Sequence, residues 1–242
     1  MSFVGKRYWL VGASDGLGEA LAHKLSRAGA ELVLSARSQD KLQSLADALP
    51  GRADVVPMDI ADNTSVEQAG QAIGAVDGVV LLAGVYWPFS ARNWNSEQAT
   101  AMADINFTGY IRVLGQVLPD FVARDAGHIV ITSSLSAFRG LPGSIGYSAS
   151  KAGNLSLAEC MYADLRKTNV RVQVALPGYI KTRLTDKNNF RMPAIMSPDD
   201  AAQQMYEFML TDRFKRSFPA GFSLIFRLAQ FLPDSWYYRL FS

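Results

Sequence analysis

The sequence predicts one three-layer α/β/α domain built on a doubly wound parallel sheet. Short apolar runs alternate along the chain with segments of helical periodicity, which is the pattern of successive strand–helix units. The runs are apolar at nearly every position, as in strands that are buried on both faces. Small, polar and glycine residues follow the runs, and such sheets bind ligands at the carboxyl ends of their strands. We therefore expect the functional site at that edge of the sheet.

The composition limits the class of protein. The chain has 242 residues, 49% of them hydrophobic, which suits a single domain over residues 1–242. A formal net charge of +2 gives no broad basic field, so we expect no nucleic-acid partner. Cys160 is the one cysteine, which fits a reducing, cytoplasmic location, and we expect it to be a small core residue. His23 and His128 join no cluster of ligand types, so no bound metal is expected.

The first half of the chain contains three strand–helix units. The runs are short and rich in β-branched and aromatic residues, which favours strands over helices. Gly29 ends the first helix, Pro50 and Gly51 close the second, and Thr64 or Ser65 is expected to cap the third. Strands are expected at residues 7–13, 31–36 and 53–60, and the helices that follow them at 16–29, 38–51 and 64–74.

The second half continues the alternation with a longer helix. That helix covers about residues 96–123, and Pro119 inside it is expected to cause a kink because proline removes a backbone hydrogen bond. Asp199 and Asp200 are interpreted as charges at the start of a later helix, where the helix dipole favours them. Further strands are expected at 77–84, 127–134 and 170–178, with a helix at 147–167.

Three glycines lie between the first strand and its helix. Gly12 permits a tight turn, Gly16 lets the backbone approach a pyrophosphate, and Gly18 lets the helix pack closely on the sheet. The helix start offers N–H groups and a positive dipole end to the phosphates. Glycines alone also suit a simple turn, but the strand before them and the amphipathic helix after them favour a dinucleotide site. Asp15 lies inside this loop and either points outward or caps the helix.

The end of the second strand indicates which dinucleotide is bound. An acidic residue there would bind a free ribose 2′-hydroxyl, but this chain has Arg37, whose guanidinium suits a phosphate. Ser14 and Ser38 add hydroxyl donors, and Lys41 adds a second positive charge. A solvated arginine is the alternative. Because Arg37 lies about twenty residues past the glycines, where the discriminating group belongs, we expect NADP(H) in preference to NAD(H).

A serine, a tyrosine and a lysine are the candidate catalytic residues. Tyr147 and Lys151 are four residues apart on one helix and share a face, while Ser134 ends the fifth strand. A neighbouring ammonium favours a phenolate, so we expect Lys151 to lower the pKa of Tyr147. Tyr147 would exchange a proton with a substrate oxygen that Ser134 polarises, while hydride moves to or from a nicotinamide.

These segments together resemble the short-chain dehydrogenase/reductase family, in its single-domain Rossmann-fold branch with GxxxGxG and YxxxK motifs. "GASDGLG" resembles its glycine-rich loop, "MDI" its adenine contact, "LLAG" the segment after strand four and "INFTG" its helix-four asparagine. "SS" with "YSASK" resembles its catalytic set, and "PGYIKT" the segment beside the nicotinamide. The resemblance implies Tyr147 as acid/base, Lys151 on the nicotinamide ribose, Ser134 orienting the substrate, and Asn106 holding a water that links Lys151 to solvent.

The resemblance also implies further cofactor contacts and shows two departures. Val11 stands where threonine is usual, and Leu82 where asparagine is usual. Each change removes a side-chain hydrogen bond that ties the central strands together, so we expect an altered structural brace rather than lost chemistry. The implied contacts are Leu17, Asp59, Ile60, Ala83, Gly84, Pro177, Gly178, Ile180 and Thr182, beside the glycine loop, Tyr147 and Lys151.

Two segments are expected to shape the substrate site. Residues 184–200 form the expected substrate loop, and residues 218–242 an apolar C-terminal extension. The extension could cover the pocket, contact a partner subunit or lie in a membrane interface; its few lysines and arginines favour the first two. Aromatic and aliphatic side chains predict an apolar substrate, namely Phe190, Met192, Ile195 and Met196 in the loop and Trp87, Phe89 and Trp94 on the opposite wall.

The sequence thus predicts an NADP(H)-dependent oxidoreductase, such as a carbonyl reductase, that interconverts a carbonyl and an alcohol on a small or medium apolar compound. The resemblance implies a homodimer or homotetramer formed through the long fourth helix and the helix of Tyr147. Two other hypotheses stay open. One is a non-catalytic NADP(H)-sensing or scaffold protein on the same fold, and the other is a peripheral membrane enzyme acting on lipid-borne carbonyls.

Overall fold

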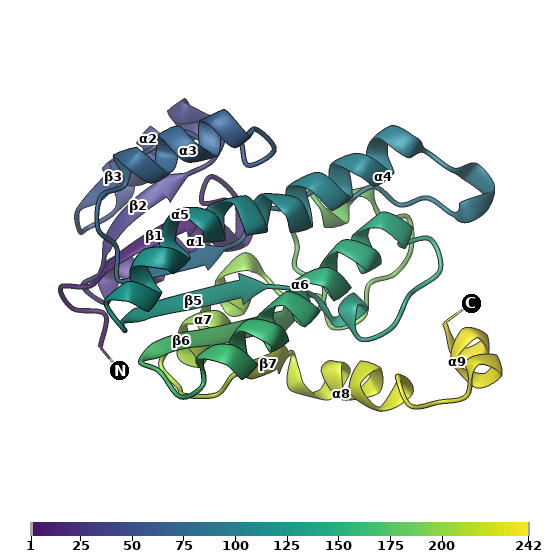
Figure 1. Cartoon of the computed structure of the whole chain (residues 1–242). Helices are drawn as coiled ribbons and strands as arrows, with labels where there is room; N and C mark the ends of the chain where they lie inside the picture. Colours follow the sequence, from purple (N-terminus) through teal and green to yellow (C-terminus); the bar gives the residue numbers. More distant parts are fainter. Residues whose placement is uncertain (1, 242) are drawn as a thin grey trace.

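The computed structural model describes residues 2–241 as a parallel sheet between two layers of helices (Figure 1). The strands are β1 (Arg7–Val11), β2 (Glu31–Ser35), β3 (Ala53–Val55), β4 (Gly78–Leu81), β5 (Gly127–Thr132), β6 (Val170–Pro177) and β7 (Lys215–Phe218). They pair in parallel in the order β3-β2-β1-β4-β5-β6-β7. The chain order reverses between β1 and β4, and this is the position where doubly wound sheets bind ligands. The predicted fold is confirmed.

Helices cover both faces of the sheet because its strands are apolar on both sides. They are α1 (Gly16–Arg27), α2 (Gln39–Ala48), α3 (Asn63–Ala72), α4 (Ser96–Ala103), α5 (Gly109–Ala123), α6 (Ile145–Leu165), α7 (Pro198–Met209), α8 (Ala220–Ala229) and α9 (Asp234–Leu240). In β1, Trp9 and Val11 belong to one buried cluster, while Tyr8 and Leu10 belong to the other. The first cluster lies under α5 and α6, and the second under α1 and α7 (Figure 1).

The long fourth helix is interrupted at a different place from the predicted one. α5 runs through Pro119 without a break, whereas residues Asp104–Thr108 form a π-helical turn between α4 and α5. Such turns insert an extra residue into a helix and are frequent at functional sites. Asn106 lies inside this turn and is fully buried. The irregularity therefore falls on a predicted site residue rather than on the proline.

Two local expectations need correction, and one is confirmed. α3 begins one residue earlier than expected, and Asp62 caps it by accepting hydrogen bonds from the N–H groups of Thr64 and Ser65. Cys160 is exposed on α6 instead of lying in the core, because its position falls on the helix face turned away from the sheet. Asp199 and Asp200 do lie in the first turn of α7, as predicted.

After α7, the described chain adds an edge strand and two short helices. β7 pairs with β6, α8 follows directly, and α9 lies beyond it near the C-terminus (Figure 1). A strand at β7 was not expected, because "KRSF" lacks the long apolar run of a central strand. In residues 2–241, no helix has both the length and the apolar content needed to cross a membrane.

A buried polar network crosses the sheet at the end remote from the predicted site. Nδ1 of His128 lies 2.8 Å from the Tyr8 hydroxyl and 3.0 Å from Nη2 of Arg171, so Nδ1 accepts. Nε2 therefore carries the proton and donates to Oε1 of Gln173 at 2.8 Å. Burial, with the nearby Arg171 charge, lowers the pKa of His128 to about 3. The network thus requires a neutral histidine.

This requirement predicts a loss of stability in mild acid. The pKa of His128 in the folded chain is below the ordinary value of 6.5, so below pH 6.5 the unfolded chain binds the extra proton and the folded chain does not. We expect the free energy of unfolding to fall by about 1.4 kcal/mol per pH unit between 6.5 and 4 from this residue alone. Urea unfolding of the wild type and of His128→Gln at several pH values isolates the dependence of the free energy of unfolding on pH that is due to His128. An equal pH dependence in the two proteins would contradict the lowered pKa of His128.

Candidate functional site

The three glycines of the loop lie where a side chain would clash with neighbouring atoms. Gly12 has φ of +97°, and a Cβ there would clash with the backbone of Ala83 on the neighbouring strand. A Cβ on Gly18 would clash with the Gly12 carbonyl oxygen. Gly16 has φ of +56°, and a Cβ there would lie 2.8 Å from Cγ2 of Thr182. The three glycines therefore let α1, β4 and the segment after β6 converge on one groove.

A cavity of about 370 Å³ opens at this convergence. Its walls come from the ends of β1, β2, β4, β5 and β6, as the topology requires. The structure brings every sequence-predicted cofactor residue to this cavity: Gly12, Ser14, Asp15, Gly16, Leu17, Gly18, Arg37, Ser38, Asp59, Ile60, Ala83, Gly84, Tyr147, Lys151, Pro177, Gly178, Ile180 and Thr182. The lining also includes residues that the sequence reasoning did not assign, among them Val85, Ile105 and Arg183.

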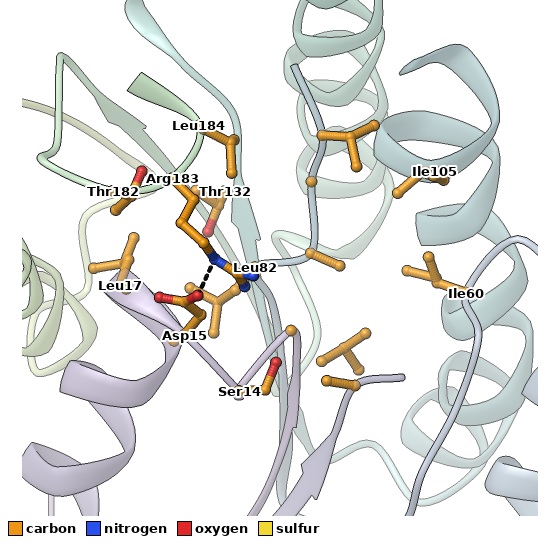
Figure 2. A pocket seen from close by; sticks show the side chains of 18 of the residues that line it. Ser14, Asp15, Leu17, Ile60, Leu82, Ile105, Thr132, Thr182, Arg183 and Leu184 are labelled. Atoms are coloured by element: carbon orange, nitrogen blue, oxygen red, sulfur yellow. Dashed lines mark ion pairs between the residues drawn. The ribbon is translucent and has the colours of Figure 1, made fainter. Parts of the chain in front are cut away.

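An ion pair spans the cavity between its two sides. Asp15 is the residue before α1, but its side chain makes no capping hydrogen bond. It is paired instead with Arg183 from the segment after β6 (Figure 2). Asp15 also pairs more distantly with Lys41, at 3.9 Å. Asp15 thus turns across the groove, so neither alternative left by the sequence, pointing outward or capping the helix, describes it. The only sequence signal for Arg183 was its place directly after Thr182.

The β2 end of the cavity is basic. Arg37, Ser38 and Lys41 line it together, so two positive charges and a hydroxyl lie where β2 meets α2. Asp15 is the carboxylate beside Lys41, and its charge is shared with Arg183. This donor set suits a phosphate more than an uncharged ribose hydroxyl.

Ser134 and Tyr147 meet at the opposite end of the groove. The Ser134 hydroxyl is hydrogen-bonded to the Tyr147 side chain, and its oxygen accepts from the Ser136 N–H at 3.2 Å and from the Ser136 hydroxyl at 3.1 Å. Because those two donors occupy the Ser134 oxygen, the Ser134 proton is left to point away from Ser136. The sequence reasoning did not include Ser136.

The pKa of Tyr147 differs from the expectation. Burial raises the pKa of Tyr147 to about 12, with Ser134 opposing and Tyr86 adding to the rise. Burial of Tyr147 outweighs the expected effect of Lys151, whose Nζ lies 5.6 Å from the ring centroid and is itself buried. Tyr147 therefore holds its proton at neutral pH, which suits a proton donor.

Lys151 is buried beneath the cavity. Its Nζ donates to the Thr132 carbonyl oxygen at 3.0 Å and lies near the rings of Tyr147 and Tyr110. Burial lowers the pKa of Lys151 to about 7. Ser133, at the end of β5, donates to the Lys151 carbonyl oxygen at 2.7 Å and so ties α6 to the strand. The amine is consequently fixed between β5 and α6.

Asn106 lies beside this group without bonding to the amine. Its Oδ1 accepts from the Val85 N–H at 2.7 Å, and its Nδ2 donates to the Val85 carbonyl oxygen at 2.9 Å. Its main-chain oxygen accepts from Nδ2 of Asn154 at 2.8 Å. The side chain of Asn106 thus holds the chain after β4, and it lines neither cavity. The predicted relay role stays a prediction.

A second cavity of about 150 Å³ meets the first, and both are lined by Tyr147, Gly178, Leu184 and Thr185. Ser134 and Tyr147 lie on its floor, and no described residue that lines it carries a charge. The substrate loop contributes Phe190, but Trp87, Phe89, Trp94, Met192, Ile195 and Met196 do not line it. Leu184 of the same loop and Phe222 and Phe226 of the C-terminal extension also line it, as expected for segments that shape the substrate site. The apolar walls that the sequence reasoning missed are Tyr86, Leu135, Leu141, Pro142 and Tyr179.

Arg139 fastens the C-terminal helices to this cavity. It donates to the Leu232 carbonyl oxygen at 2.6 Å and pairs with Asp234. Its guanidinium lies 4.2 Å from the centroid of the Tyr237 ring, and the Tyr237 hydroxyl returns a bond to the Arg139 carbonyl oxygen. α8 is thereby held with Phe222 in the cavity wall.

Comparisons with known proteins agree with this geometry. The family model for short chain dehydrogenases matches residues 6–192. An uncharacterized oxidoreductase of Myxococcus xanthus is 38% identical in an alignment 232 residues long that covers 93% of this chain and 92% of the relative.

Solved structures share the same fold. An alcohol dehydrogenase from the archaeon Thermococcus sibiricus, complexed with 5-hydroxy-NADP, has a TM-score of 0.80 at 25% identity and covers 88% of this chain and 95% of its own. A short chain dehydrogenase/reductase from Burkholderia phymatum, in complex with NAD, has a TM-score of 0.85 at 23% identity. It covers 95% of this chain and 94% of its own.

The Arg139 contacts predict how α8 and α9 respond when Arg139 is replaced. Arg139→Ala removes an ion pair, a carbonyl bond and a ring contact at once, so α8 and α9 should open more often. We expect amide hydrogen exchange to quicken at least tenfold in residues 220–240 and to stay unchanged in β4 and β5. Arg124→Ala is the matched control, because Arg124 stacks on Phe121 and bonds the Val76 carbonyl away from the tail. If residues 220–240 exchanged at the same rate in both variants, Arg139 would not be holding α8 and α9 in place.

Proposed function

The chain belongs to the short-chain dehydrogenase family, and we propose that it is an NADP(H)-dependent oxidoreductase that interconverts a carbonyl and an alcohol on an apolar compound. One observation carries the proposal. Among the residues that line both the glycine-lined groove and the uncharged second cavity, Tyr147, hydrogen-bonded to Ser134, is the one with an ionisable side chain. A proton donor thus lies between the places suited to a dinucleotide and to an apolar substrate.

The groove fits a phosphorylated dinucleotide. Gly12, Gly16 and Gly18 have no Cβ, which would fill the space beside them, so the backbone can approach the ligand there. The start of α1 directs its N–H groups into the cavity. Arg37 and Lys41 would hold a 2′-phosphate at the β2 end. When bound, the nicotinamide supplies or accepts hydride.

The proton chemistry rests on Tyr147, Ser134 and Lys151. Tyr147 keeps its proton at neutral pH because burial raises its pKa to about 12, so it can donate to a carbonyl oxygen that becomes an alkoxide. The Ser134 proton, which points away from Ser136, would turn from Tyr147 to hold the same oxygen. Lys151 loses its charge as the pH rises through about 7, so its support of the developing phenolate should weaken above that pH.

The substrate is proposed to be an uncharged, small or medium, largely apolar carbonyl or alcohol. Aromatic rings from α8, the substrate loop and the segment after β6 enclose the second cavity. The Tyr179 ring contacts Phe190 edge-on and Phe222 in a tilted arrangement. A charged group would lose its hydration there without an opposite charge to replace it. The tail is thus proposed to act as a wall of the site.

Assembly is proposed through α5 and α6. Both helices expose apolar side chains on their outer faces, namely Ile111, Val122 and Tyr162. Such side chains on neighbouring helices are typical of a contact between subunits. A homodimer or homotetramer would bury them without covering either cavity.

The acid/base role predicts a specific pattern of loss. Tyr147→Phe keeps the ring but removes the proton, so we expect turnover of an accepted carbonyl to fall at least a hundredfold, with NADPH affinity changed less than threefold. NADPH absorbance with a panel of ketones and aldehydes measures the first, and calorimetry the second. Tyr206→Phe on α7 is the control, because it alters a tyrosine on the other face of the sheet. Unchanged turnover in Tyr147→Phe would rule out the assigned role.

The basic end of the groove predicts cofactor preference. We expect NADPH to bind more tightly than NADH, and Arg37→Gln to weaken NADPH binding about 10- to 100-fold while leaving NADH binding nearly unchanged. Arg52→Gln is the control, because Arg52 lies just before β3, outside the cavity lining. Calorimetry with both cofactors decides. Equal or tighter NADH binding by the wild type would refute the preference.

A further inference from the structure

Tyr110 joins α5 to the end of β4. It is fully buried, and its hydroxyl lies 3.1 Å from the Leu81 carbonyl oxygen and 2.9 Å from the Ala83 carbonyl oxygen. A phenol has one proton, so the two carbonyls share it. Burial raises the pKa of Tyr110, which keeps that proton in place. The hydroxyl thus bonds the main chain on both sides of Leu82.

The Leu81–Gly84 segment, which Tyr110 holds, makes no hydrogen bond through its own side chains. β4 ends at Leu81, and the N–H groups of Leu82 and Ala83 both donate to the Val11 carbonyl oxygen, at 2.8 and 2.9 Å. Leu82 has an aliphatic side chain, and so has Val11 on the adjacent strand. Neither can donate a hydrogen bond across the strand ends. The brace at this point therefore comes from α5.

The braced segment passes directly beside the buried amine. A Cβ added to Gly84 would lie 3.5 Å from Oδ1 of Asn106 and 3.9 Å from Nζ of Lys151. Asn106 holds the next residue, Val85, through both its N–H and its carbonyl. Asn106 and Tyr110 are four residues apart, so one helical region secures both ends of the segment.

The ring of Tyr110 faces the same amine. Nζ of Lys151 lies 5.5 Å from the Tyr110 ring centroid, and the ring of Tyr147 is at a similar distance on the amine's own helix. These two tyrosines are the titratable groups that contact Lys151 from α5 and α6. Among the described residues no ion pair involves Lys151, and burial is the cause of its lowered pKa. An aromatic face within about 6 Å favours the charged amine.

We propose that Tyr110 is a positioning residue of the site, whose hydroxyl fixes the Leu81–Gly84 segment against Lys151 and whose ring supports the Lys151 ammonium. The consequence for catalysis rests on the proposed function, since Lys151 acts there through Tyr147. The two physical effects on the segment and on the amine do not rest on it. They can be measured without turnover.

Two variants separate the hydroxyl from the ring. Tyr110→Phe keeps the ring and removes the hydroxyl, whereas Tyr110→Met removes both and still fills much of the space. Tyr8→Phe is the matched control, because it deletes another buried tyrosine hydroxyl, one that bonds His128 at the far end of the sheet. The readouts are amide hydrogen exchange of residues 82–85 and the side-chain NMR resonance of Lys151 as a function of pH.

We expect exchange at residues 82–85 to quicken about fivefold in both Tyr110 variants. The titration midpoint of Lys151 should stay unchanged in Tyr110→Phe and fall by about half a unit in Tyr110→Met. Tyr8→Phe should change neither readout. Wild-type exchange in Tyr110→Phe, or a wild-type midpoint in Tyr110→Met, would overturn the proposal. A failure of the wild type to bind NADPH would defeat the proposed function and leave these two results standing.

Discussion

The site depends on an amine held inside the protein without a carboxylate beside it. Lys151 is almost fully buried, its one direct hydrogen bond among the described residues goes to a main-chain carbonyl at the end of β5, and burial brings its pKa close to neutrality. Such a group is tolerated only where the surrounding chain is fixed. Ser133 fixes Lys151 from the end of β5, through the Lys151 carbonyl oxygen. Tyr110 and Asn106 fix the segment after β4 that passes beside Lys151.

The two cavities follow from the same arrangement. Parallel strands bring small residues to one edge, and the glycine positions let backbone segments approach more closely than any side chain would allow. Tyr147, one turn before Lys151, then separates a polar, basic groove from an apolar cavity. The tail completes the apolar side through α8, which Arg139 holds in place. The chemistry is thus confined to one phenol at the boundary.

Local spacing allowed much of this to be predicted. The glycine loop, Arg37, and the Tyr147–Lys151 pair are each defined within a few residues, and the topology brings them together as expected. Contacts between distant segments could not be read in the same way. Asp15 with Arg183, and Phe222 in place of Trp87 in the substrate wall, depend on how loops fold over the sheet edge. The pKa of Tyr147 was predicted in the wrong direction, because spacing shows that Lys151 is near but not that burial outweighs its charge.

The transfer of a labelled hydride tests the central claim most directly. NADPH carrying deuterium at both C4 positions of the nicotinamide is incubated with the protein and a panel of uncharged aromatic and aliphatic ketones, and the products are analysed by mass spectrometry. We expect deuterium on the carbinol carbon of at least one product with the wild type, and at least a hundredfold less with Tyr147→Phe. Tight NADPH binding without label transfer to any ketone, or equal transfer by the two proteins, would contradict the account.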